Sequence, residues 1–498
     1  MIIKDSLMTE NTVSEQEFLN NIVNYNFSNL HMDSRAVNPG DLFIVMNDAN
    51  FKASVFIEHA VMQGAAIIAI NNIYINDVLL QKYANVIFIR SEDTRLFAAK
   101  LSRIFYKPNI ERIAAITGTN GKSSVVSFMH QILSLLGEKS LTIGTMGVVM
   151  NETNIKLNIP NLTTPDIISI NKVLSNAAEN GAVYAAIEAS SHGIDQQRIV
   201  GLPIDIAAFT NLSHDHMDYH NNMESYWQVK KELFTKFLLP NGTAIINSES
   251  IYMEDLKNTC IKRKLQTISY GRDGDIYLIK HNKIDGWQSK ISLNICGELC
   301  NFQTSLIGAF QIQNLMCAVA ALLPWGFSPK SISKMLSEVK NLAGRMSLIK
   351  SSNGDVIVDY AHNPNGVLYA LKSAKEYVDV MNKIVTIVGC GGDRDKEKRP
   401  IVGEIVSAYS DFIIITDDNP RTENPKRIRK DIIAGIKTNS NVLEMPDRQE
   451  AIKYGLSMLG KGDVLMILGK GHEKYGTTEG LADKNDINVT KSLLFSNI

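Results

Sequence analysis

Cysteine is scarce in this chain. Its 498 residues include five cysteines, and none of them falls in the paired CxxC spacing of a structural zinc site. Five is also an odd number, and the residues are widely scattered, so the sequence offers no disulfide framework. We therefore expect reduced, mostly buried thiols and a cytoplasmic protein.

Long apolar runs and an excess of one charge are missing as well. No segment approaches the about 20 apolar residues of a membrane-spanning helix. The N-terminal MIIKDS has no basic start leading into an apolar core, so we expect no signal peptide. A net charge of -1 gives no reason to expect nucleic-acid binding through bulk electrostatics, although a local basic pocket is still allowed. The remaining composition, 45% hydrophobic and 21% charged, is that of an ordinary globular protein.

The strongest functional motif is ITGTNGKSS at residues 116–124. An apolar run at 112–117 predicts a buried strand before it, and apolar spacing at 124–136 predicts a helix after it. Strand, glycine loop and helix N-terminus together form a phosphate cradle, in which Lys122 would neutralise phosphates and Ser123 would reach Mg²⁺. Ile116 stands where the generic motif has glycine, so the alternative is a glycine-rich turn with an exposed lysine.

Apolar strands alternate with helical segments along most of the chain, which predicts an α/β fold with parallel sheets. We place domain boundaries at 1–108, 109–342 and 343–498, with an antiparallel excursion at 271–305. In the last domain the expected strands end in GCGGDRD, DDNPR and GKGHE. Because parallel strands end at one edge of a sheet, these loops should share a site.

Carboxylate and imidazole groups follow two strands of the middle domain. Glu188 follows the expected strand 183–187, and His214, His216 and His220 lie in a loop after another. These groups suit a hard divalent cation that bridges ATP and a substrate. The alternative for the histidines is a polar loop with ordinary hydrogen bonds. Zinc is less favoured, because no cysteine joins the cluster and no HExxH is present.

Three further stretches allow two interpretations each. By spacing alone, residues 230–234 predict a solvated, charged helix face. The sequence DYAHNP at 359–364 predicts either an Asx or proline turn or a contact to ribose or base. The last domain carries positive and negative side chains in its strand-end loops: Arg394, Arg399, Arg421, Asp418 and Glu473. They suit the binding of a zwitterionic amino acid, or equally a surface salt-bridge network.

Taken together, the motifs resemble those of the Mur ligases, which form amide bonds in peptidoglycan synthesis at the expense of ATP. The matching motifs occur in order along nearly the whole chain: Asp33-Ser34-Arg35 with Pro39–Phe43, GTNGKSS, Thr163-Thr164-Pro165, EASSH, NLSHDHMDYH, KxxLF, Gly344-Arg345-Met346, DYAHNP, GCGGDRD, DNPR and GKGHE. The resemblance implies an α/β architecture of three domains: an N-terminal UDP-substrate domain, a central P-loop domain with a parallel sheet, and a Rossmann-like C-terminal domain that binds an amino acid.

The resemblance also implies an activity. The motif at 418–421 matches members that add meso-2,6-diaminopimelate to UDP-N-acetylmuramoyl-L-alanyl-D-glutamate, through an acyl phosphate. L-Lysine addition, another acyl acceptor in a specialised pathway, and a non-catalytic nucleotide-binding protein are the alternatives. The expected partners are ATP, Mg²⁺ and these small substrates, with no nucleic acid and no membrane, and the expected state is a monomer.

The functional residues implied by the resemblance fall into four groups. Lys122, Glu188, His216 and Lys230 are catalytic, and Ser123, Glu188, His216 and a carbamylated Lys230 hold the metal. The expected contacts to ATP are Gly118, Thr119, Asn120, Gly121, Lys122, Ser123, Ser124, Asn314, Arg345 and Asp359. The expected contacts to the UDP-muramoyl dipeptide are Ser34, Thr163, Thr164, Ser190, Gln196 and Arg198. The expected contacts to diaminopimelate are Arg394, Asp418, Asn419, Pro420, Arg421, Gly469 and Glu473.

The chain departs from the family pattern in two places. Residues 47–53 read NDANFKA, where the family has glycine and then an Asp-Gly pair, which puts the uridine contacts there in question. Gln311 replaces an asparagine on the expected adenine side, which is a milder change.

Overall fold

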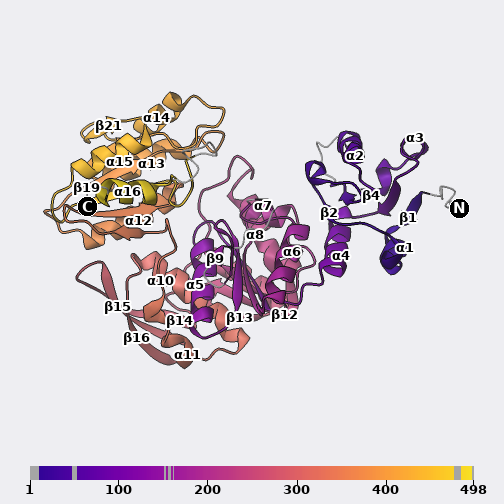
Figure 1. Cartoon of the computed structure of the whole chain (residues 1–498). Coiled ribbons are helices and arrows are strands. Elements are labelled where there is room, and N and C mark those ends of the chain that lie inside the picture. Colours follow the sequence, from indigo (N-terminus) through magenta and orange to yellow (C-terminus); the bar gives the residue numbers. More distant parts are fainter. Residues whose placement is uncertain are drawn as a thin grey trace. The chain divides into compact units, whose positions relative to one another are not determined.

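The computed structural model describes residues 11–46, 53–110, 112–150, 153–154, 159–160, 162–475 and 484–495. The altered stretch at 47–53 lies, except for Ala53, outside the described residues. The chain divides into two compact units, residues 1–113 with 139–204 and residues 114–138 with 205–498. Figure 1 labels their elements.

Unit 1 begins with a small parallel sheet in the order β1-β5-β4-β3-β2. Its core consists of apolar side chains of these strands and of α2. The elements are β1 (Thr12–Ser14), α1 (Glu15–Asn20), β2 (Leu30–His31), β3 (Leu42–Ile44), α2 (Ala53–Met62), β4 (Ile67–Asn71), α3 (Asp77–Lys82), β5 (Ile87–Ser91) and α4 (Thr94–Tyr106), with short 3₁₀ turns at Ile22–Asn24, Ser34–Ala36 and Asn72–Tyr74.

The rest of unit 1 supplies four strands in the order β10-β7-β8-β9. β10 and β7 are parallel, and the following pairs are antiparallel. The elements are β7 (Ser140–Gly144), β8 (Gly147–Met150), β9 (Thr153–Asn154), α6 (Ile167–Glu179), β10 (Tyr184–Glu188) and α7 (Ser191–Asp195).

Unit 2 holds the strand order β16-β15-β14-β13-β12-β11-β6. The expected antiparallel excursion is confirmed, since β14, β15 and β16 pair antiparallel. The elements are β6 (Arg112–Thr117), α5 (Lys122–Leu135), β11 (Ile204–Phe209), α8 (Met223–Glu232), a π-helical turn at Leu233–Phe237, β12 (Leu238–Asn247), α9 (Met253–Arg263), β13 (Gln266–Tyr270), β14 (Ile276–Ile284), β15 (Gln288–Ile295), β16 (Glu298–Thr304), α10 (Ala309–Leu322) and α11 (Pro329–Ser333), with 3₁₀ turns at Leu323–Trp325 and Leu336–Glu338.

A second sheet in unit 2 has the order β17-β18-β22-β19-β20-β21, and every neighbouring pair except β17 and β18 is parallel. Apolar residues on both of its faces are buried. The elements are β17 (Ser347–Ile349), β18 (Asp355–Asp359), α12 (Pro364–Tyr377), β19 (Ile384–Val388), α13 (Lys398–Tyr409), β20 (Phe412–Ile415), α14 (Pro425–Ile433), β21 (Val442–Glu444), α15 (Arg448–Ser457), β22 (Val464–Leu468) and α16 (Asp486–Phe495).

The turn between β14 and β15 joins the core of this second sheet. Trp287 is 8% exposed and belongs to the same hydrophobic cluster as Met346 and Ile357. Its indole ring stacks on Tyr377, with centroids 5.2 Å apart, and its Nε1 donates a hydrogen bond of 2.7 Å to Asp355. The antiparallel extension and the second sheet are therefore packed through one shared core.

Helices of bilayer-crossing length and apolarity are not found among the described residues.

Candidate functional site

The loop between β6 and α5 has the geometry of a phosphate cradle, as its motif predicts. Gly118 and Gly121 have φ angles of 143° and 91°, where a side chain is disfavoured. A Cβ atom on Gly118 would collide with the Thr210 hydroxyl, and one on Gly121 would collide with the Asn314 side chain. Glycine is therefore required at both positions, and the loop delivers its backbone directly to the start of α5.

Two lysine side chains converge on this loop. Lys122 Nζ donates to the carbonyl oxygens of Gly118 and Thr119 at 2.9 Å each. Lys230 Nζ also donates to the Gly118 oxygen, at 2.9 Å. Burial, reinforced by the charge of Lys122, holds the pKa of Lys230 well below its usual range.

The interpretation of 230–234 as a solvated face is wrong for Lys230, which is only 1% exposed. On α8 it is buried together with Tyr226 and Trp227, and its ammonium lies 4.5 Å from the centre of the Tyr226 ring. Its neighbour Lys231 instead forms an ion pair of 2.8 Å with Asp255.

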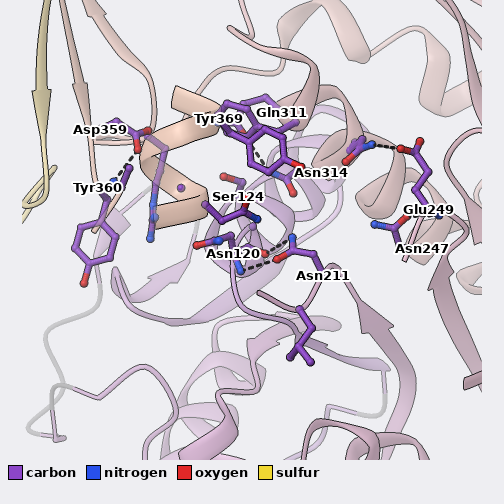
Figure 2. Close-up of a pocket in the computed structure, with 18 of the residues that line it drawn as sticks. Asn120, Ser124, Asn211, Asn247, Glu249, Gln311, Asn314, Asp359, Tyr360 and Tyr369 are labelled. Atoms are coloured by element: carbon purple, nitrogen blue, oxygen red, sulfur yellow. Dashed lines mark hydrogen bonds between the residues drawn. The ribbon is translucent and has the colours of Figure 1, made fainter. Parts of the chain in front are cut away.

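A cavity of about 290 Å³ opens beside the P-loop (Figure 2). Asn120, Gly121 and Ser124 line it on one side, and Asn314, Asp359 and Tyr360 are further lining residues. The Asn314 amide donates to Gln311 Oε1 at 2.9 Å, and the Gln311 amide donates to Asn341 at 3.0 Å. Gln311, which replaces the asparagine of the family pattern, therefore holds the side chain of Asn314 in place.

Arg345 and Asp359 lie in the same wall of the cavity. The Arg345 guanidinium donates to Ser123 Oγ at 3.2 Å, so it reaches the first turn of α5. The Asp359 carboxylate accepts hydrogen bonds from the backbone of Met346 (2.7 Å) and Ala361 (2.8 Å). Burial raises the pKa of Asp359, against the opposing effect of Arg345.

Two asparagines that sequence reasoning missed support the P-loop. Asn211 accepts from the Asn120 backbone at 3.0 Å and donates to its carbonyl oxygen at 3.1 Å. Asn363, fully buried at the start of α12, bonds to the Asn120 amide and donates to Asp215 at 2.9 Å. Each asparagine lies in a loop that follows a strand. The expectation that functional groups gather after the ends of parallel strands, which singled out Glu188, therefore applies to both asparagines.

The three histidines of the 210–220 loop have different surroundings. His214 lies 2.7 Å from Asp395, and Glu397 brings a third possible ligand atom within 4.8 Å of these two. His216 is partly exposed and lies 3.9 Å from Asp215. His220 is buried and stacks on Tyr226. Burial opposes ionisation of Asp215, but His216, His362 and Lys398, with the hydrogen bond from Asn363, together outweigh it and hold its pKa below the usual range.

In unit 1 the predicted substrate contacts form one hydrogen-bonded cluster. Thr164 Oγ1 donates to the Glu188 carbonyl at 2.7 Å and lies 3.0 Å from Ser190 Oγ. Arg198 donates to the Thr164 carbonyl at 2.8 Å and to Gln196 at 2.6 Å.

The acidic end of this cluster is the Glu188 side chain, which is 1% exposed. Its carboxylate accepts from the Thr145 backbone at 2.8 Å, and the Thr145 hydroxyl contacts Thr163 at 3.2 Å. Ser34 belongs to a different part of the unit, where its hydroxyl contacts His59 at 3.0 Å.

In the second sheet, the expected amino-acid contacts follow three neighbouring strands, β22, β19 and β20. Arg421 has φ of 50° and donates to the Gly392 carbonyl at 2.6 Å. Asp418 lies 3.4 Å from Lys470, and a Cβ on Gly469 would come within 2.9 Å of Asp418. Glu473 accepts from the Tyr360 hydroxyl at 2.8 Å, and Arg394 lies 3.8 Å from Asp218.

Arg399, one of the charges assigned to a zwitterionic ligand, has a structural role instead. It is completely buried and binds Glu423 at 2.8 Å and Asp431 at 2.9 Å. These hydrogen bonds from Arg399 hold the pKa of Glu423 at about 2. Arg399 therefore forms salt bridges, as the alternative stated, but they are buried and not on the surface.

Comparisons with known proteins find Mur ligases by sequence and by structure. The Mur ligase middle domain matches residues 116–322, and the Mur ligase glutamate ligase domain matches 344–471. A UDP-N-acetylmuramoyl-L-alanyl-D-glutamate--2,6-diaminopimelate ligase of Rickettsia conorii is 40% identical over 91% of this chain and 92% of its own length. A solved structure of a ligase with that name has a TM-score of 0.66 and 29% identity, covering 95% of both chains. The fold is also shared with the MurF ligase of Thermotoga maritima, solved in complex with ADP, at a TM-score of 0.64 and 16% identity over 94% of this chain and 98% of that one.

Replacing Arg399 should destabilise the second sheet of unit 2. Arg399→Met leaves Glu423 and Asp431 without their buried cation, so we expect a loss of about 3 kcal/mol in the free energy of unfolding. Lys396→Met is the matched control, because Lys396 is exposed and lies 3.7 Å from the same Glu423; it should cost under about 1 kcal/mol. Urea unfolding measures both, and equal losses would contradict the structural role of Arg399.

Proposed function

This chain belongs to the Mur ligase family, and on that premise we propose that it joins meso-2,6-diaminopimelate to UDP-N-acetylmuramoyl-L-alanyl-D-glutamate in peptidoglycan synthesis, using ATP. The observation that carries the proposal is the 40% identity to the Rickettsia ligase over 91% of the chain. The DNPR motif at the end of β20 supports the choice of amino acid.

ATP would occupy the cavity beside the P-loop. The N-terminus of α5 and the loop amides would hold the phosphates, with Lys122 and Arg345 neutralising their charge. Asn314 would contact the adenine and Asp359 the ribose. The side chains that line the cavity in unit 2 support this assignment, because they offer amide, carboxylate and guanidinium groups around one space.

Mg²⁺ fits the donor groups of the chain. Within unit 2, Ser123 and a carbamate on Lys230 would offer the oxygen atoms that this cation prefers, and His216 would offer a nitrogen. Glu188 of unit 1 offers a carboxylate, which is an oxygen donor of the same kind. When bound, the ion would neutralise phosphate charge. The carbamate would form because burial lowers the pKa of Lys230 and so favours the neutral amine, which attacks CO₂ and releases a proton.

The reaction would proceed in two steps. The γ-carboxylate of D-glutamate attacks the γ-phosphorus of ATP, the bond to ADP breaks, and an acyl phosphate results. The amine of diaminopimelate then attacks the acyl carbon, and phosphate leaves as the amide forms. The chain's own residues would act by positioning and charge neutralisation, and Lys122 Nζ already lies 2.9 Å from the Gly118 carbonyl of the P-loop.

Selection of diaminopimelate would depend on charge at the three strand ends. Arg421 would pair with the distal carboxylate, which lysine lacks, while Arg394 and the loop of Asp418, Asn419 and Pro420 complete the pocket with Gly469. Glu473 would accept the ammonium group.

The hydrogen-bonded cluster of unit 1 would bind the UDP-muramoyl dipeptide. Thr163, Thr164, Ser190, Gln196 and Arg198 would make these contacts, and Ser34 would contact the UDP portion. We also propose three domains, at 1–108, 109–342 and 343–498, and a cytoplasmic monomer; the spans of the two family matches support the last two domains.

One assay tests the proposed function. ADP release should require the UDP-muramoyl dipeptide and should be much faster with diaminopimelate than with lysine or other amino acids. Lys122→Ala should abolish it, because the phosphates lose their main cation. Activity on another acyl acceptor, with none on the dipeptide, would overturn the proposal.

Arg421→Ala should impair use of diaminopimelate far more than ATP binding. Loss of the pair with the distal carboxylate should cost about 2–5 kcal/mol in kcat/KM for diaminopimelate. Lysine should be affected little, so the discrimination between the two amino acids narrows. Arg427→Ala, an exposed arginine on α14, is the control. A similar loss for both amino acids would argue against the role of Arg421.

Carbamylation of Lys230 can be observed directly. With ¹³C-bicarbonate, the wild-type protein should show a carbamate signal by NMR, because burial lowers the pKa of Lys230 and so favours the neutral amine that reacts with CO₂. Lys230→Met should lose the signal, and Lys231→Met should keep it, since Lys231 is paired with Asp255. A signal that persists in Lys230→Met would locate the carbamate elsewhere.

A further inference from the structure

Tyr360 lies between two groups that serve different substrates in the proposed reaction. It directly follows β18 and lines the cavity beside the P-loop (Figure 2). The Arg345 guanidinium lies 4.3 Å from the centre of its ring, and its hydroxyl donates to Glu473 Oε1 at 2.8 Å. Burial, followed by the charge of Glu473, raises the pKa of Tyr360, so the hydroxyl remains a donor at neutral pH.

These contacts continue to the P-loop. Arg345 donates to Ser123 Oγ at 3.2 Å, 222 residues away in sequence. A continuous series of contacts therefore leads from Ser123 through Arg345 and Tyr360 to Glu473. Ser123 and Arg345 belong to the ATP site, and Glu473 belongs to the amino-acid pocket.

The backbone around Tyr360 is packed too closely to absorb a displacement. The Tyr360 N–H donates to the Gly344 carbonyl at 2.8 Å. A Cβ on Gly471 would lie 2.8 Å from the Gly344 oxygen and 3.0 Å from Tyr360 Cβ. The segments that carry Arg345, Tyr360 and Glu473 are thus in direct contact, and a shift of one moves the others.

We propose that Tyr360 is a positioning residue that couples the ATP site to the amino-acid pocket. This inference rests on the proposed function. Its ring is held by Arg345 when that guanidinium engages phosphate, and its hydroxyl then aims the Glu473 carboxylate at the ammonium group of diaminopimelate. Because binding coupling is reciprocal, each substrate favours the other.

Two substitutions separate the hydroxyl from the ring. Tyr360→Phe keeps the contact with Arg345 and loses the bond to Glu473, so KM for diaminopimelate should rise roughly tenfold while KM for ATP, measured at low diaminopimelate, stays the same. Tyr360→Leu loses both contacts, so both KM values should rise. In the wild type, KM for diaminopimelate should fall as ATP approaches saturation, and Tyr360→Leu should abolish this dependence. Tyr454→Phe, an exposed tyrosine on α15, is the control for loss of a hydroxyl.

The outcomes distinguish this inference from the proposed function. If the wild type is active with diaminopimelate but Tyr360→Phe raises both KM values equally, or neither, the coupling role of Tyr360 is wrong. A fall in kcat alone would also overturn it, since that pattern reports a general structural defect. A wild type with no activity on diaminopimelate would overturn the proposed function and the inference with it.

Discussion

Two lysine side chains share one carbonyl oxygen at the P-loop, and the surrounding part of unit 2 is arranged around their close approach. Lys122 and Lys230 both donate to Gly118 O. Burial and the charge of Lys122 lower the pKa of Lys230, and the charge of Asp215 opposes this shift. The pKa of Asp215 is itself lowered by His216, His362, Lys398 and the hydrogen bond from Asn363. Asn363 donates to Asp215 and also bonds to Asn120 of the loop. The charge balance and the shape of the phosphate cradle are therefore set by the same few contacts.

Strained backbone gathers in the loops of this unit. Left-handed φ angles of 50° to 57° occur at His216, Met346, Asp393 and Arg421, none of which is glycine. Hydrogen bonds to other segments support two of them: Met346 N donates to Asp359, and the Arg421 side chain donates to the Gly392 carbonyl. Such conformations persist only where the surroundings over-determine them, and they are common where side chains must be aimed at a ligand.

The sequence predicted those helices and strands that are determined by neighbouring residues, through apolar periodicity and the placement of glycine. The strand before the P-loop, the helix after it and the antiparallel excursion all lie where periodicity and glycine placement put them. The burial of Lys230 could not be read from spacing, because its partner Gly118 is 112 residues away. Arg399 was misassigned for the same reason, since its two carboxylates follow it by 24 and 32 residues. The family resemblance implies a carbamylated Lys230, which stays a prediction, and the burial and lowered pKa of this lysine came from the packing. Tyr360 lies within the DYAHNP motif, but the motif gave it no role, and only the contacts to Arg345 and Glu473 single it out.

The placement of Trp287 affects how this protein can be divided in the laboratory. Its indole belongs to the turn between β14 and β15, yet the residues that bury it, Met346, Ile357 and Tyr377, come later in the chain. A fragment ending at residue 342 would contain Trp287 but not the residues that bury it. It would also lack Asp355, which accepts the hydrogen bond from the Trp287 indole. Such a fragment would expose an apolar surface that promotes aggregation. Its poor solubility would then result from the choice of boundary and not from low stability of the nucleotide-binding sheet.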